Sequence, residues 1–120
     1  MQIVSLVLVA FVALEHALFL VMEMFLWTTP RIRRTFGTTA DFAQASKTLA
    51  ANQGLYNGFL AAGLVWGLLS PDMAMSRTIE IFFIACVIVA GVYGGFTVKR
   101  SILLVQALPA LLALIAVLVR

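Results

Sequence analysis

The sequence predicts an all-α integral membrane protein, a four-helix bundle built as a single transmembrane domain over residues 1–120. Three observations predict it. Hydrophobic residues make up 63% of the chain and charged residues only 11%, whereas a soluble domain is about 25% charged. The mean hydropathy is +1.10. Four apolar stretches each approach the ~20 residues that a helix needs to cross a bilayer.

The predicted spans are residues 3–27, 49–69, 79–98 and 102–119. The first is too long for a signal-peptide core and follows no basic segment, so we interpret it as a retained span. Pro30 follows the first span, and Pro71 ends the second within Ser70-Pro71-Asp72, because proline cannot continue a helix. The lone Cys86 lies in an apolar run, which predicts an inert buried thiol.

Two local features refine these helices. In the long first loop, Thr38 or Thr39 can cap a helix whose first turn holds Asp41, so the second helix is expected to begin before it enters the membrane. Pro109 lies within the fourth span, where it should kink the helix and release the carbonyl of Val105.

Charged and small residues complete the pattern. Arg77 and Glu80, three apart, predict a local ion pair. Small residues predict faces for close helix packing in the second and third spans. They are Gly54, Gly58, Ala61, Ala62, Gly91, Gly94 and Gly95.

The basic residues orient the bundle. Six lie in two loops: Arg31, Arg33, Arg34, Lys47, Lys99 and Arg100. Only Arg77 and Arg120 lie on the other side. By the positive-inside rule, the two loops face the cytoplasm and both termini lie on the periplasmic side of a bacterial inner membrane, which the chain crosses as a multi-pass protein.

A basic rim is expected at the cytoplasmic face. Its members are Arg31, Arg33, Arg34, Lys99 and Arg100, and they would meet anionic lipid headgroups or bind a soluble anion. The positive charge is explained by topology, so no nucleic-acid partner is predicted.

Polar side chains inside the spans gather toward the cytoplasmic half. Glu23 lies about one turn inside the first span, level with Asn52 and Gln53, while Glu15 and His16 lie ~11 Å deeper. Asn57 reaches most of the way to that depth. His16 and Glu23 share one stripe, which an arc of the second helix can face. The predicted ligand-binding set is Glu15, His16, Glu23, Asn52, Gln53, Tyr56, Asn57, Tyr93 and Gln106.

These residues are costly, since an ionisable side chain at the centre of a membrane helix costs ~2.5–3.5 kcal/mol on insertion scales. The functional interpretation is a site for a small amphipathic or lipid-like molecule. The structural alternative is that the cluster only hydrogen-bonds helices together, within the chain or between subunits of an expected homo-oligomer. One histidine per chain, with no second at i+4, argues against a metal or haem site, and no cofactor is identified.

The stretches LEHALFLVMEMFLW and LAANQGLYNGFLAAGLVWGL resemble the small bacterial membrane proteins grouped as domain of unknown function 1304. The likeness extends over nearly all 120 residues and rests on the glutamate-histidine pair, the second glutamate and NQGLYNG. It implies a four-helix membrane protein but no activity.

Two more distant likenesses supply functional hypotheses. The helix layout and long cytoplasmic loop are similar to those of the membrane-associated eicosanoid and glutathione enzymes, but Asn52, Gln53 and Asn57 are neutral where those enzymes carry arginine and glutamate. Small multidrug transporters have a first-helix glutamate comparable to Glu15, for which proton and cationic drug compete. Whether the protein is an enzyme, a binding protein or a transporter stays open at this point.

Overall fold

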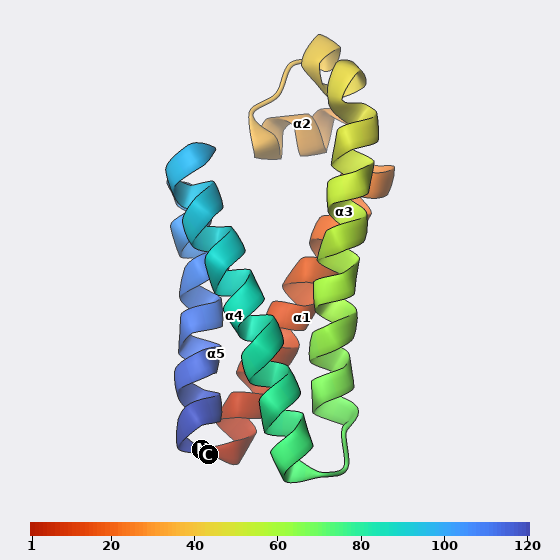
Figure 1. The fold of residues 1–120 in the computed structure, drawn as a ribbon. Coiled ribbons are helices and arrows are strands. Elements are labelled where there is room, and N and C mark those ends of the chain that lie inside the picture. The colour runs from red at the N-terminus through yellow and green to blue at the C-terminus, as the bar shows by residue number, and fades with distance from the viewer. The chain divides into compact units, whose positions relative to one another are not determined.

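The computed structural model describes residues 1–120, and its regular elements are all helical (Figure 1). They are α1 (Gln2–Phe25), α2 (Pro30–Phe36), α3 (Ala40–Leu69), α4 (Met73–Thr97), the π-helical turn η1 (Leu103–Ala107) and α5 (Leu108–Val119). The predicted all-α class is confirmed. The short helix α2 was not predicted: Pro30, which ends the first span, also starts α2, because proline suits the first turn of a helix.

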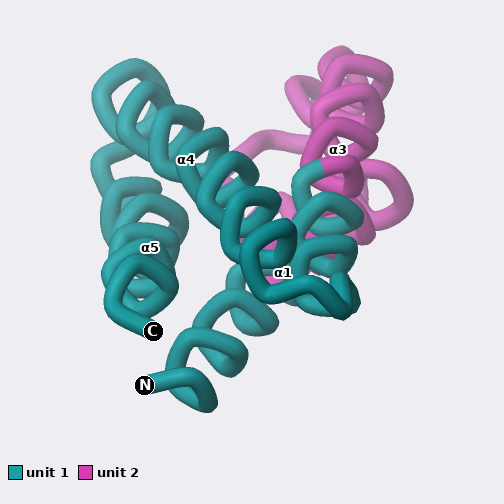
Figure 2. Tube along the Cα trace, turned by 60° about the horizontal axis from the view of Figure 1, so that its bottom comes forward, with its two compact units in different colours: residues 1–14, 60–120 teal, residues 15–59 magenta.

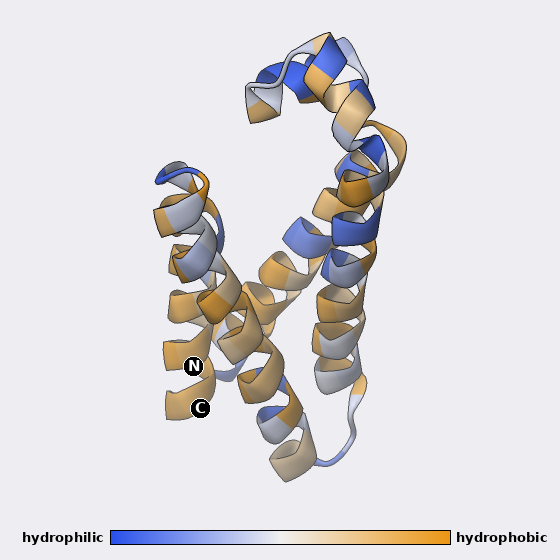
Figure 3. Cartoon of the chain, turned by 45° about the horizontal axis from the view of Figure 1, so that its top comes forward, coloured by the Kyte–Doolittle hydropathy of each residue, from blue (hydrophilic) through white to orange (hydrophobic).

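Two helices, Gln2–Phe25 and Met73–Thr97, are long and apolar enough to cross a membrane, and Leu103–Val119 forms a shorter apolar segment. The helix α3 is less apolar, since Asn52, Gln53 and Asn57 interrupt its hydrophobic residues. Figure 3 shows this contrast: polar residues gather in α2 and the first half of α3, whereas α5 is almost entirely hydrophobic.

Capping residues set where α3 and α4 begin. Thr39 Oγ1 accepts a hydrogen bond from the backbone N–H of Phe42 at 3.1 Å, which confirms the predicted early start of the second helix. Asp72 Oδ2 accepts from the N–H of Met75 at 2.8 Å, so α4 begins at Met73 and not near residue 79.

Pro109 disturbs the last helix through a π-helical turn that directly precedes it. The N–H of Leu108 donates to the carbonyl of Leu103, five residues back. The wider turn accommodates a residue that has no N–H of its own. The predicted disruption at Pro109 is thus found as a change of hydrogen-bond register.

The chain divides into two compact units, coloured separately in Figure 2. Unit 1 comprises residues 1–14 and 60–120, and segments of α1, α3, α4 and α5 share its core. The buried core residues are Val9, Val12, Ala13, Leu64, Ile84, Val87, Ala110, Ala113 and Val117. A Cβ on Gly91 would lie 2.8 Å from the backbone nitrogen of Ala107, which confirms close packing on the predicted glycine face.

Unit 2 comprises residues 15–59: the second half of α1, the helix α2 and the first part of α3. Trp27 joins these pieces. Its Nε1 donates to Ser46 Oγ at 3.1 Å, and its ring lies 5.0 Å from that of Phe36. At Gly37, where φ is +70°, the chain leaves α2 in the left-handed conformation that glycine favours.

Candidate functional site

The centre of the candidate site is a buried side-chain pair in unit 2. The Nδ2 of Asn57 donates to Oε1 of Glu23 at 2.6 Å, and the two residues are 7% and 9% exposed. A carboxylate accepting from an amide forms a charge-assisted bond if ionised. The sequence predicted that Asn57 could approach the stripe of Glu23 and His16, and this contact confirms it.

Glycine brings the two backbones close enough for this bond. A Cβ on Gly54 would lie 2.8 Å from Met24 Cγ, 3.0 Å from Glu23 Cβ and 3.2 Å from the carbonyl oxygen of Leu20. One turn later, a Cβ on Gly58 would collide with the Leu20 side chain. In α1 and α3 these contacts join positions three and four apart, which lie on one face of each helix. Gly54 and Gly58 of the small-residue face predicted for the second span therefore pack on α1, whereas Ala62 is exposed.

The other polar residues of α1 lie beyond this pair, further from α2. His16 is fully buried, with its ring edge-on to Phe19 at 5.3 Å. Glu15 is half-buried, and its Oε2 is enclosed without a hydrogen-bond partner. Glu23 Oε1 thus has a neutral partner, and Glu15 Oε2 has none.

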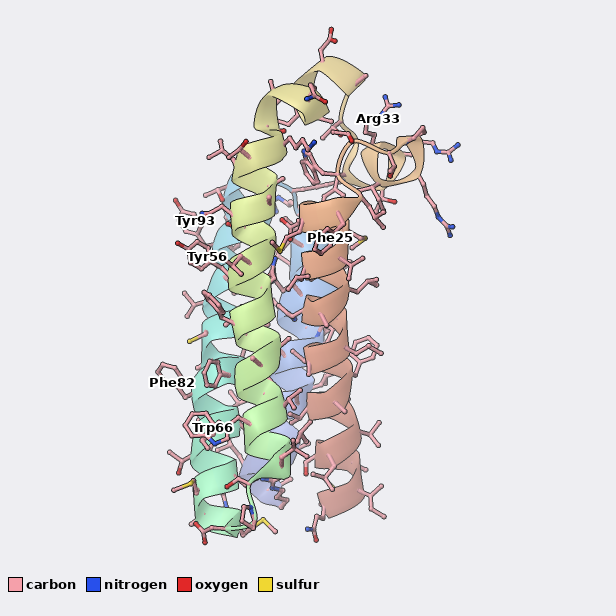
Figure 4. All side chains as sticks on the ribbon, turned by 90° about the vertical axis from the view of Figure 1, so that its right-hand side faces the viewer. Phe25, Arg33, Tyr56, Trp66, Phe82 and Tyr93 are labelled. Carbon is pink, nitrogen blue, oxygen red and sulfur yellow. The ribbon has the colours of Figure 1, made fainter.

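Three predicted members of the cluster do not join it. Asn52, Gln53 and Tyr56 are exposed, and in Figure 4 the Tyr56 side chain points outward from α3. The predicted level of Glu23 agrees with its contact with Gly54, next to Gln53, but Asn52 and Gln53 face away and the side chain that bonds Glu23 is that of Asn57. The reason is rotational: Asn52 lies ~160° around the helix from Gly54, and the glycine face turns toward α1.

The remaining predicted residues lie in unit 1 or in α2. Tyr93 is 71% exposed and points away from α4 (Figure 4), and Gln106 is half-buried in η1. Within the rim, Arg33 has its Nε buried without a partner, and Arg100 lies 5.9 Å from the ring of Phe96. The other rim members, Arg31, Arg34 and Lys99, are exposed.

A second buried polar cluster, in unit 1, was not predicted. Arg120 Nη2 lies 2.7 Å from Glu80 Oε2, and both side chains are buried. Ser76 donates to Glu80 Oε1 at 3.4 Å, and Arg120 donates to Ser5 and Ser76 at 3.3 and 3.4 Å. The cluster therefore links α1, α4 and α5 through one ion pair.

The predicted ion pair of Arg77 with Glu80 is wrong. Glu80 pairs with Arg120, while Arg77 donates to the carbonyl oxygen of Leu118 at 2.7 Å. A signal for the true partner was present, because Glu80 and Arg120 are each 18 residues from the predicted turn between the last two spans, at residues 98 and 102. Equal distances from a turn place two residues at one level of a helical hairpin.

The family model "Protein of unknown function (DUF1304)" matches residues 10–118. The chain belongs to the DUF1304 family. The uncharacterized protein YpaA of Lactococcus lactis subsp. lactis (strain IL1403) is 31% identical over 120 residues, which cover 97% of this chain and 98% of that protein. No solved structure gives a significant match.

This DUF1304 chain thus holds two buried polar clusters with different chemical capacity. The cluster in unit 1 is internally neutralised by its own arginine. The cluster in unit 2 has acceptor oxygens and no neutralising cation. No group of three or more histidine, cysteine or acidic side chains is arranged to hold a metal ion. Binding through hydrogen bonds and charge is what the unit 2 cluster can do.

Proposed function

We propose that the protein is a multi-pass membrane protein that binds a small amphipathic molecule at Glu23 and Asn57. The molecule reaches this site from the end of unit 2 that carries α2. The observation that carries the proposal is the contrast between buried carboxylates: Glu80 has its own arginine, whereas Glu23 has only the amide of Asn57. An unpaired carboxylate in a low-dielectric setting is costly, and function is the common reason that one is retained.

The surface supports placement in a bilayer. Only 28% of the most apolar window of α1 is buried, and 33% of that of α4, so most of their hydrophobic side chains face outward. Helices of this length and composition at the core of a soluble protein would be covered, because exposed apolar area favours aggregation. Lipid chains would cover it here. We propose further that the four predicted spans cross a bacterial inner membrane.

The basic residues support the direction of entry. Arg31, Arg33 and Arg34 lie in α2, directly after the end of α1 that carries Glu23. Under the proposed topology they face the cytoplasm. A reporter active only in the periplasm should work when fused after Arg120 and fail when inserted near Gly37. The opposite pattern would contradict the direction of entry.

Native mass spectrometry tests the binding. We expect wild-type protein, gently extracted into detergent, to carry an additional small-molecule mass that is absent from Glu23→Gln. The amide keeps an oxygen that can accept from Asn57 but loses the charge. The matched control is Asp41→Asn, at an exposed carboxylate in the first turn of α3, which should retain the mass. Equal occupancy in wild type and Glu23→Gln, or an empty wild type, would contradict the proposal.

One observation favours a second candidate, a proton-coupled transporter of cationic molecules. Oε2 of Glu15 is enclosed without a hydrogen-bond partner, so a bound proton or a cation would have to offset the charge of this carboxylate. In proteoliposomes, Glu15→Gln should abolish pH-dependent efflux of a cationic dye, since an amide neither takes up nor releases a proton near neutral pH and has no charge to hold the cation. If the dye does not move in wild type, transport of that class of molecule is excluded.

A further inference from the structure

The acceptor atoms of the Glu23–Asn57 pair define the chemistry that would complete it. Asn57 uses Nδ2 toward Glu23 Oε1, so Glu23 Oε2 and Asn57 Oδ1 remain as acceptors for a further group. An ionised carboxylate is an acceptor only, so the pair calls for a hydrogen-bond donor.

Charge narrows the class of donor. When ionised, Glu23 carries a negative charge that meets only the neutral amide of Asn57, and Oε2 of Glu15, the next carboxylate of unit 2 toward the centre of α1, has no hydrogen-bond partner. A cation on the molecule would offset the cost of burying that charge, and burial strengthens the attraction. The arginines of α2 favour an anion, but they follow Trp27 in the chain, after the end of α1.

The surroundings favour an attached hydrocarbon chain. On the Glu23 side of α1, Leu26, three residues further along, is 38% exposed, and Phe19, four residues earlier, is half-buried. A chain lying along this surface would bury apolar area at about 25 cal/mol per Å². On the basis of the proposed function, we infer that the site takes an amphiphile with a primary ammonium head, held by Glu23 and Asn57.

Four probes that share a dodecyl tail and differ in headgroup test the inferred ammonium head. Equilibrium binding is measured to protein in phosphatidylcholine nanodiscs, with empty nanodiscs as background, for dodecylammonium, dodecyltrimethylammonium, dodecanol and dodecanoate. Dodecylammonium should bind about tenfold more tightly than dodecanol or dodecanoate, because it alone among these three combines charge with N–H donors. Dodecyltrimethylammonium, which has charge but no donor, should be intermediate.

Variants assign the preference to the pair. Glu23→Gln should reduce dodecylammonium binding by about tenfold and leave dodecanol binding unchanged. Asp41→Asn should match wild type. If Glu23→Gln fails to assemble, the order of the four probes on wild type decides the inference by itself.

Two outcomes would overturn the inference in different ways. If dodecanol or dodecanoate binds as tightly as dodecylammonium and loses binding in Glu23→Gln, the ammonium head is wrong while the proposed function stands. If none of the four probes binds above background, the inference is wrong as well, and the mass-spectrometric experiment alone then decides the proposed function.

Discussion

Glu80 in unit 1 and Glu23 in unit 2 are both buried carboxylates that lie against a glycine of α3, yet their partners differ. A Cβ on Gly67 would lie 2.7 Å from Glu80 Cγ, and one on Gly54 would lie 3.0 Å from Glu23 Cβ. Glu80 is held by Arg120 and Ser76, whereas Glu23 is held by Asn57 alone. The same helix packing therefore supports a charge-neutral network in one unit and a carboxylate with only a neutral partner in the other.

A structural polar cluster and a functional one differ in how the stability of the fold responds when one member is replaced. A closed ion pair needs nothing from outside, and loss of one member leaves a buried charge. A carboxylate with only a neutral partner carries a cost in the empty protein, so its replacement need not destabilise the fold. The two clusters should therefore respond to mutation with opposite sign.

The largest effect is expected from Arg120→Met. It leaves Glu80 buried without its cation and should lower the free energy of unfolding by about 3–5 kcal/mol. The double variant Glu80→Leu/Arg120→Met should recover most of that loss, because no charge remains buried. Thermal unfolding in detergent measures both. A single variant as stable as wild type would mean that the ion pair does not hold α4 to α5.

Glycine substitutions should lower the stability of the fold by an intermediate amount, and more beside the unit 1 cluster than beside the unit 2 cluster. Gly67→Ala places a Cβ 3.3 Å from the backbone nitrogen of Glu80 and should cost about 1–3 kcal/mol, since backbone cannot move aside cheaply. Gly58→Ala meets only the flexible side chain of Leu20, which can move aside, so the higher helix propensity of alanine, up to ~1 kcal/mol, should offset most of its cost. We expect Gly67→Ala to melt lower than Gly58→Ala, and the reverse order would contradict the comparison.

The smallest effect on stability is expected at the unit 2 cluster itself. Glu23→Gln and His16→Leu, made separately, should leave the melting temperature unchanged or raised while binding of the co-purifying molecule is lost. Melting and native mass spectrometry on the same preparations measure the two properties. If both variants melt several degrees lower, the cluster is a structural network and the proposed function is wrong.

Local features of the fold could be predicted from the sequence because they depend on neighbouring residues. Hydropathy predicted the helices, Thr39 and Asp41 the early start of α3, and Pro109 the disturbance before α5. The meeting of Glu23 with Asn57 was also predictable, since a long apolar helix hides a polar group only against another polar group. The family was recognisable from the same residues.

Tertiary structure alone decided the rotation of each helix and the choice of partner. The polar arc of α3 could have faced α1 as a whole, but close packing at Gly54 and Gly58 turned Asn52 outward and kept only Asn57 inside. Dispersion and close approach along a glycine face act over a whole helix surface, so they outweigh a single amide. Likewise Glu80 had a basic neighbour three residues away, yet it pairs with Arg120, 40 residues along the chain, because the α4–α5 hairpin brings that arginine to the same level.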